Sequence, residues 1–402
     1  MSRLSVPVAL LCLGVLTACS AQIPGQGRPA PVSTGTPTPT TATPTPPPRF
    51  GPGTVTESHR IAGAVVLVGQ LLPHLVETCT PSGPFVNPEE TEGAGGLFIA
   101  GTAVPTLTQY GFVAGWASCQ TAPDVRASTV FVAEMSDPDS AAAAADALAG
   151  SLAVEGYEAG ELPDAPDARV LSLERTADQD GGDSVSLQIL VPMERMLVYV
   201  FHADVDAEQA AQNATLVLAE QAELLADFTP TPQPRVPALN PDPFNLARRV
   251  IDTPGESTNY TGSYDLDSYL RVALAPDTEQ QILMANGFVG TYLNQSNDVD
   301  GLGYQAVVYE FGSLPEADAA YQAFRGIEET EFDNRTTFVV PELPTTPCYY
   351  FPAAKGSDVL YQRCYVRVRS YLGSVDVYGI TDPLDTGQIR MLLRAQRTAM
   401  DN

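Results

Sequence analysis

The fold is decided by two stretches of sequence: STVFVAEMSDPDSAAAAADALA at residues 128–149 and QAVVYEFGSLPEADAAYQAF at residues 305–324. Each begins with a run of β-branched and aromatic residues, which is typical of a strand, and then passes into a helical pattern. Pro138 and Pro315 mark the two helix starts, where a proline is tolerated because the first N–H groups of a helix have no intrahelical partner. The sequence therefore predicts one strand-then-helix unit that occurs twice.

The repeat extends on both sides of this unit. Gly111-Phe112-Val113 recurs as Gly287-Phe288-Val289, an offset of about 176 residues. The later elements also recur in the same order: strands 185–191 and 196–203 with a helix over about 206–227, then strands 359–369 and 374–380 with a helix over about 384–399. We therefore expect an α+β fold with two related domains. Each is predicted to hold a mainly antiparallel sheet with helices packed on one face, of ferredoxin-like character.

Two proline-rich stretches divide the chain. Residues 28–49 are mostly Pro, Thr, Ser and Gly without a periodic apolar face, so they cannot bury enough surface to offset the entropy of ordering. Residues 229–243 form a second such stretch. The predicted segments are a signal peptide at 1–18, a lipidated cysteine with a Pro/Thr-rich disordered stalk at 19–53, an N-terminal α+β domain at 54–228, a Pro-rich linker at 229–244 and a C-terminal α+β domain at 245–402.

The amino terminus has the pattern of an export signal. Arg3 precedes an apolar run from Val6 to Leu16, which is too short to cross a bilayer as a helix. The run ends in Leu16-Thr17-Ala18-Cys19, a lipobox, whose cysteine thiol accepts a diacylglycerol before the signal peptidase cuts. The alternatives are an ordinary secretory signal that contains Cys19, or a short buried helix. We expect lipidation at Cys19, which anchors the chain on the outer face of a bacterial membrane.

The composition is strongly acidic. Lys and Arg together number 21 against 48 Asp and Glu, the formal net charge is −27, and Lys355 is the only lysine. Nucleic acid is therefore not expected as a partner, because binding to it requires a basic surface that displaces counterions from phosphate. The partners expected are the membrane, through the Cys19 lipid, and an unknown envelope protein or lipid ligand.

The cysteines fit a compartment in which disulfides persist. Of six cysteines, Cys12 leaves with the signal and Cys19 carries lipid. The others form two well-separated pairs: Cys79 with Cys119, and Cys348 with Cys364. We expect one bridge in each domain, and the absence of a C-x-x-C spacing argues against zinc and thioredoxin-like chemistry.

The geometric argument for a disulfide is strongest for Cys348 and Cys364. They flank a predicted turn centred on Gly356, so antiparallel strands folded there place the two residues opposite each other. For Cys79 and Cys119 the argument is weaker, since it rests only on the lack of another partner nearby.

No motif for catalysis or for metal binding is evident. The three histidines, His59, His74 and His202, do not form an H-E-x-x-H pattern, and no G-x-S-x-G sequence is present. The acidic loops at 178–183 and 297–301 lack the first ligand and the terminal glutamate of a calcium loop, so hairpin turns explain them better. We expect no catalytic residue, no bound metal and no cofactor.

Arginines concentrate near the carboxyl end of the chain. Six of them form a possible docking face for an anionic partner or lipid headgroup: Arg363, Arg367, Arg369, Arg390, Arg394 and Arg397. The last three share one face of the final predicted helix. The alternative is a structural role, in which arginines near a helix C-terminus complement its dipole and pair with local carboxylates.

These features resemble a family of actinobacterial, mycobacterial-type two-domain lipoproteins of unknown function, built from N- and C-terminal domains of unknown function 7373. The resemblance rests on the lipobox, on Glu57-Ser-His-Arg-Ile-Ala62 leading into the apolar residues 65–72, and on the paired strand-then-helix units. It covers most of the mature chain and implies the location and the architecture. It brings no catalytic residues. The sequence departs from the family at 85–96, which is rich in Gly and Glu.

Three functions remain open from the sequence. The preferred one is a non-catalytic cell-envelope lipoprotein that binds a ligand or partner between its two domains. The alternative is a structural or assembly factor of the envelope, and the third is an envelope hydrolase that uses scattered carboxylates. An apolar pocket between the domains favours the first, a filled contact the second, and two facing carboxylates in a cleft the third.

Overall fold

The computed structural model describes residues 51–92, 102–162, 165–175, 183–330, 335–352, 359–380 and 385–402. The predicted signal peptide, the lipobox at Cys19 and nearly all of the stalk lie outside these ranges, as do the predicted turn at Gly356 and most of the acidic loop at 178–183. Within the described ranges no helix is both long and apolar enough to cross a membrane.

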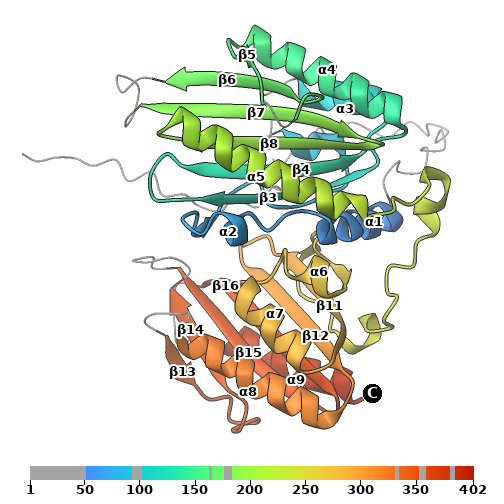
Figure 1. The fold of residues 1–402 in the computed structure, drawn as a ribbon. Coiled ribbons are helices and arrows are strands. Elements are labelled where there is room, and N and C mark those ends of the chain that lie inside the picture. Colours follow the sequence, from blue (N-terminus) through green and yellow to red (C-terminus); the bar gives the residue numbers. More distant parts are fainter. Residues whose placement is uncertain are drawn as a thin grey trace, which may run out of the picture. The chain divides into compact units, whose positions relative to one another are not determined.

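The first half of the chain forms an antiparallel sheet. Its strands are β1 (Glu77–Thr78), β2 (Gly83–Phe85), β3 (Ala114–Thr121), β4 (Ala127–Glu134), β5 (Glu158–Gly160), β6 (Arg169–Arg175), β7 (Ser184–Met193) and β8 (Met196–Asp204). They are ordered β1-β3-β4-β8-β7-β6-β5, with β2 also paired to β3 (Figure 1). In the centre of the sheet, Val130 of β4 lies opposite Val200 of β8.

The helices of this half are α1 (Pro52–Gly63), α2 (Val68–Leu71), α3 (Ala103–Gln109), α4 (Pro138–Val154) and α5 (Ala207–Ala226), with the 3-10 turn η1 (Pro88–Thr91). The start of α4 lies at the proline where the sequence predicts it. The Asp137 carboxylate accepts a hydrogen bond from the N–H of Ser140, and Pro138 occupies the first turn. Alanines on one side of α4 are buried, so the helix packs closely on the sheet.

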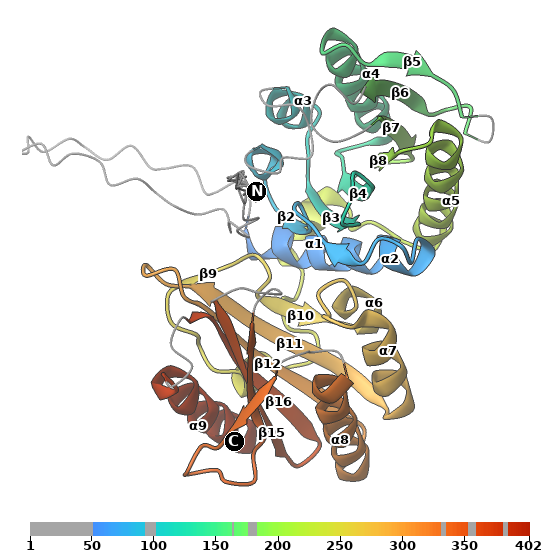
Figure 2. The same cartoon turned by 90° about the vertical axis from the view of Figure 1, so that its left-hand side faces the viewer.

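The α+β fold class is confirmed, but helices lie on both faces of the first sheet instead of the one face predicted. Val130 and Val132 of β4 belong to the same core cluster as Ala214 of α5. Their neighbour Phe131 belongs to a different cluster, with Ala144 of α4. Alternate residues of a strand point to opposite faces, so a strand that is apolar at every position requires cover on both sides. Figure 2 shows α4 and α5 on opposite sides of β7 and β8.

The second half repeats this architecture. Its strands are β9 (Glu256–Ser257), β10 (Gly262–Tyr264), β11 (Phe288–Asn297), β12 (Gly303–Phe311), β13 (Thr336–Phe338), β14 (Cys348–Pro352), β15 (Leu360–Val368) and β16 (Tyr371–Ile380). The order is β10-β11-β12-β16-β15-β14-β13, with β9 also paired to β11. Strand for strand, this is the order of the first sheet, so the predicted duplication is present in the topology.

The helices of the second half are α6 (Leu266–Tyr269), α7 (Pro276–Ala285), α8 (Leu314–Thr330) and α9 (Gly387–Asp401). Here too both faces of the sheet are covered, since α8 and α9 lie on opposite sides of β15 and β16 (Figure 2). Two further 3-10 turns, η2 (Gln233–Ala238) and η3 (Ala247–Arg249), lie in and just after the predicted linker.

The described residues belong to one compact unit, in which α1 contacts both sheets. It packs on β3 of the first sheet and on β10 and α6 of the second half. The predicted linker also packs against the first half, because Val236 of η2 is buried and Thr231 bonds to α1. The proline-rich segment 229–244 is therefore part of the packed structure.

Candidate functional site

An arginine-lined groove lies between α9 and the end of β15. Amphipathic spacing places Ile389, Leu393 and Met400 of α9 in the core, so that Arg394 and Arg397 project from its other face. Arg369 follows directly after β15 and adopts a left-handed backbone conformation with φ of 54°. The structure thus brings together side chains from two segments that the sequence separates by more than twenty residues.

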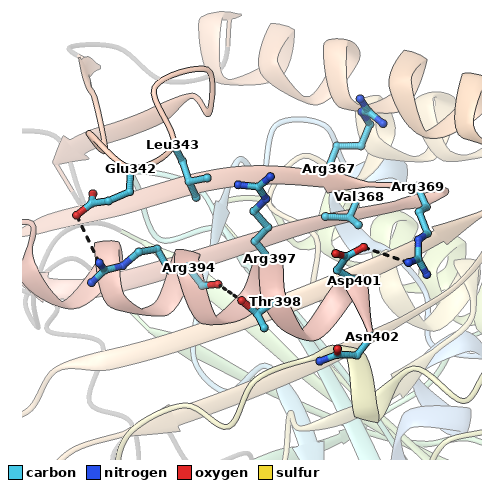
Figure 3. A pocket seen from close by; sticks show the side chains of 10 residues that line it. All are labelled: Glu342, Leu343, Arg367, Val368, Arg369, Arg394, Arg397, Thr398, Asp401 and Asn402. Carbon is cyan, nitrogen blue, oxygen red and sulfur yellow. Dashed lines mark hydrogen bonds and ion pairs between the residues drawn. The ribbon is translucent and has the colours of Figure 1, made fainter.

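Ion pairs border this groove at two sides, and Figure 3 shows one pair at each side. At one side Glu342 accepts from Arg390 at 2.9 Å and from Arg394 at 3.4 Å. At the other side Arg369 contacts Asp401 of α9 at 3.1 Å. These contacts agree with the predicted structural alternative, in which the arginines pair with local carboxylates.

Arg397 differs from its neighbours. It is exposed and lies between the two ion pairs in Figure 3, without a dashed contact of its own. Among the residues that the structure describes, no carboxylate or hydrogen-bond acceptor contacts its guanidinium. Because a free guanidinium presents five N–H donors in a planar fork, it is suited to a carboxylate or a phosphate group.

The groove has a volume of about 530 Å³. Its floor is partly apolar, since Leu343 and Val368 line it together with the arginines. A hydrogen bond from its own backbone N–H, followed by hydrogen bonds from Arg390, holds the pKa of Glu342 below its usual value. Glu342 therefore stays ionised and keeps Arg390 and Arg394 in place.

Of the six predicted docking residues, Arg363 and Arg390 do not line this groove, and Arg367 lines it with its side chain turned away. The Arg367 side chain pairs with Asp318 of α8 and points away from α9 in Figure 3. Arg363 is buried, with its side chain only 11% exposed. Both occupy odd-numbered positions of β15, and these side chains face α8. Alternate residues of a strand point to opposite faces, so these two side chains point away from the face on which the groove lies.

Arg363 instead forms the centre of a buried charge cluster. It donates to Asp376 through Nε at 2.8 Å and through Nη2 at 3.1 Å, and to Glu328 at 3.1 Å. Tyr361 and Tyr365 donate to the same two carboxylates. Burial opposes the charge of Arg363, but the neighbouring Asp376 carboxylate and the other partners raise its pKa well above the usual value. A cavity of about 50 Å³ adjoins this cluster. The sequence analysis did not detect it, because its members come from strands and a helix far apart in the chain.

The four cysteines within the described residues form the two bridges that the sequence predicts. Cys79 is bonded to Cys119, and Cys348 is bonded to Cys364. Cys348 and Cys364 are directly opposed in the β14–β15 pairing, which confirms the geometric argument made for them. Each bridge links strands of a single sheet, so it stabilises one half of the chain.

A pair of buried glutamates joins α1 to the first sheet. Glu57 of α1 and Glu134 of β4 have fully buried side chains. Burial and the nearby Glu57 carboxylate raise the pKa of Glu134 to about 8, while Arg195, which donates to Glu134, opposes the shift. Two facing carboxylates with one raised pKa are the pattern named for a hydrolase. Neither residue lines the groove or the cavity beside Arg363, however, and full burial withholds both from a substrate.

The motif Glu57-Ser-His-Arg60 connects α1 to three other parts of the chain. Glu57 accepts from the N–H of Thr231 at 2.8 Å in the linker segment. Ser58 donates to the carbonyl of Gly115 in β3 at 2.6 Å. Arg60 donates to the carbonyl of Thr229 at 3.0 Å. The sequence analysis used this motif only to support a family resemblance. The signal that could have indicated its packing role is the row of polar residues within a buried helix.

The third residue of the motif, His59, reaches into the second half. Its ring stacks on Tyr264 with centroids 4.3 Å apart and an interplanar angle of 23°. Its Nε2 lies 2.8 Å from the carbonyl oxygen of Asn259, to which it donates. Burial lowers the pKa of His59 to about 4, against weaker opposing hydrogen bonds. The ring is therefore neutral at physiological pH.

Other side chains fill the contact between the two halves. Tyr260 donates to the carbonyl of Ser82 at 2.6 Å, and Arg271 donates to the carbonyl of Val65 at 2.7 Å. Apolar residues from both sheets also belong to one continuous core cluster. The predicted ligand site between the domains is thus occupied by packed side chains, because α1 lies there.

The remaining histidines do not form a metal centre. His202 is buried between Asn213, at 3.4 Å, and Asp204, at 3.9 Å. Burial lowers the pKa of His202 to about 4. The described part of the chain contains no cluster of three or more His, Cys, Asp or Glu residues arranged to hold a metal ion.

Comparison with known families gives a match for the first half of the chain. Residues 44–241 match the family model "Domain of unknown function (DUF7373) N-terminal". This range includes α1, the whole first sheet and η2. The curated proteins contain no match to this chain.

One similar solved structure is the extracellular domain of PknH from Mycobacterium tuberculosis. The likeness has a TM-score of 0.30 and 12% sequence identity, and it covers 41% of this chain and 96% of that domain. A likeness of this extent does not establish a shared fold.

Proposed function

We propose that this protein is an exported lipoprotein, anchored through Cys19 to the outer face of a bacterial membrane, which binds an anionic ligand or partner without catalysing a reaction. The lipobox at residues 16–19 supports the anchor, and the two disulfides fit an oxidising compartment. The observation that carries the binding role is the groove of about 530 Å³. In it Arg397, unlike the paired arginines beside it, contacts no acceptor among the described residues.

The groove is favoured over the contact between the two halves on physical grounds. A ligand entering that contact must displace the stacked pair of His59 and Tyr264 and break buried hydrogen bonds, each with a cost of about 1 kcal/mol or more. The groove is already open, and its volume lies within the range of small-molecule sites, roughly 300–1,000 Å³.

The anchor is tested by replacing Cys19 with alanine in the full chain, expressed in an actinobacterial host. Loss of lipid labelling, of cleavage before residue 19 and of membrane retention is expected. Cys12→Ala is the matched control, because Cys12 lies in the same apolar run but outside the lipobox, and it should be processed normally. Membrane retention of Cys19→Ala at the level of Cys12→Ala would refute the anchor.

The binding role is tested by native mass spectrometry of the mature chain purified from its own host. We expect an additional bound mass that is reduced in Arg397→Glu. Arg235→Glu is the matched control, since Arg235 is also exposed but lies in η2. The unmodified mass in the wild-type chain, or an equal bound mass in both variants, contradicts binding at the groove.

The filled contact between the halves favours a second candidate, a structural or assembly factor of the envelope. Such a protein requires a rigid shape and no ligand. The two candidates are distinguished by deleting the gene for this protein in its host and reintroducing it with the substitution Arg397→Glu. If the variant restores the envelope fully, the structural role is favoured. If it does not, the binding role is favoured.

A further inference from the structure

The groove is a local concentration of positive charge on a chain whose formal net charge is −27. Its lining includes the arginines Arg367, Arg369, Arg394 and Arg397. Glu342 and Asp401 supply carboxylates, and Asn402 lies beside them. At physiological ionic strength, charges more than about 8 Å away are largely screened, so the acidic remainder of the surface does not cancel this attraction at contact distance. An anion that enters the groove is therefore attracted locally.

The arginines are also held in position before any ligand arrives. Arg394 is paired with Glu342, and Arg369 with Asp401, at the two sides of Arg397, for which the described residues supply no acceptor. Side chains that are already ordered lose less rotamer entropy when they bind. Their planar donor forks match the paired oxygens of a phosphate group. The arrangement thus favours a phosphate at Arg397, with further donors on either side.

The apolar surface of the groove narrows the class of ligand. Leu343, which is only 8% exposed, and Val368, which is half-buried, line it. Exposed apolar surface gains free energy only when it contacts an apolar group. An inorganic anion leaves this surface wet, whereas an amphipathic anion covers it.

We propose that the groove binds an anionic phospholipid, with the headgroup phosphate at Arg397 and the adjoining acyl segment against Leu343 and Val368. This rests on the proposed function, because an anchor at Cys19 is what keeps the groove close to a lipid surface. Phospholipids are the amphipathic phosphates of such a surface. Their phosphate matches the arginines of the groove, and their acyl chains match its apolar floor.

The test uses a soluble lipid and the chain from Ser20 onward, which contains every described residue. Dihexanoyl phosphatidylglycerol, kept below its micelle concentration, is titrated calorimetrically at about 0.15 M salt, where surface charge is screened. Saturable binding is expected, with affinity reduced about tenfold in Arg397→Glu, as for loss of one charge-assisted contact. Arg235→Glu makes the same change of charge in η2 and should bind as the wild-type chain does.

Two further probes separate the possible sources of the phosphate. Glycerol 3-phosphate carries the headgroup without acyl chains, and dihexanoyl phosphatidylcholine carries the chains with a neutral headgroup. Both should bind at least about tenfold more weakly than dihexanoyl phosphatidylglycerol. Equal binding of glycerol phosphate identifies a free-anion site and overturns the lipid assignment. Equal binding of phosphatidylcholine, or an equal loss in both arginine variants, overturns it as well.

Failure of this inference is distinguishable from failure of the proposed function. If the titration shows no lipid binding while native mass spectrometry shows a protein bound through Arg397, the lipid assignment fails and the binding role stands. If Cys19→Ala changes neither processing nor membrane retention, the anchor fails whatever the titration shows.

Discussion

Replacing His59 with alanine tests whether α1 holds the two halves of the protein together. The change removes a ring stacked on Tyr264 and the hydrogen bond to the carbonyl of Asn259. The lost stacking and hydrogen bond are each worth about 1 kcal/mol, and the cavity left in a buried site adds a similar amount. We expect the free energy of unfolding to fall by about 3 kcal/mol near pH 7.5.

The pH dependence gives a sharper test, because it isolates the imidazole. Burial lowers the pKa of His59 from 6.5 in the unfolded chain to about 4 in the folded chain. The unfolded state therefore binds a proton first as the pH falls, and stability is lost between pH 6.5 and pH 4. At pH 5 the loss due to His59 is about 2 kcal/mol, and at pH 7.5 it is close to zero.

The assay is urea denaturation followed by circular dichroism at pH 7.5 and at pH 5. The deficit of His59→Ala relative to the wild-type chain should shrink by about 2 kcal/mol at the lower pH. His59→Phe, which keeps a ring against Tyr264, should be less destabilised at pH 7.5 and should show the same flattened pH dependence. His202 is unchanged in all three proteins, so its own titration cancels. An unchanged pH dependence in both variants would refute a buried, neutral His59.

Three other predictions concern the interior of the chain. Arg363→Leu leaves the buried Asp376 carboxylate without its partner, so unfolding should require about 3–5 kcal/mol less, and denaturation at the wild-type midpoint would contradict the buried cluster. Replacing Cys348 and Cys364 together with serine removes a bridge across 16 residues of sequence and should lower stability by about 3 kcal/mol; equal thermal midpoints under non-reducing conditions would oppose this. Glu134→Gln should stabilise the chain relative to the wild type more at pH 9 than at pH 5. A carboxyl group whose folded pKa is raised to about 8 contributes stability below its unfolded pKa of 4.5 and loses it as the pH rises through 8. A constant difference across that range, measured by thermal denaturation, would count against the protonated glutamate.

The local pattern of the sequence was sufficient for the order of the elements that it identified, although it did not identify β3, β6, β11, α3 or α7. Strand and helix periodicities around residues 128–149 and 305–324 predicted β4 with α4 and β12 with α8, and the repeated order predicted two sheets of the same topology. The bridge between Cys348 and Cys364 was also predictable, because a hairpin fixes the register of two adjacent strands. In each case the determining contact lies within one short segment of chain.

Part of the groove could be predicted in the same way. Arg390, Arg394 and Arg397 share one face of a helix by their spacing alone. The spacing does not reveal that Glu342 approaches from 48 residues away and engages two of the three. It therefore could not show that Arg397, alone of the three, contacts no acceptor among the described residues.

The sequence by itself determined the duplication, the element order, the hairpin disulfide and the arginine row on α9, because each depends on periodicity or on neighbours in the chain. Only the tertiary structure decided which face of each strand is covered, and hence that Arg363 is buried against Asp376 while Arg369 borders the groove. It also decided that α1 occupies the contact between the halves, where His59 meets Tyr264 across 205 residues of sequence. Periodicity specifies which residues share a face; what packs against that face depends on contacts between distant segments, which form only when the whole chain folds.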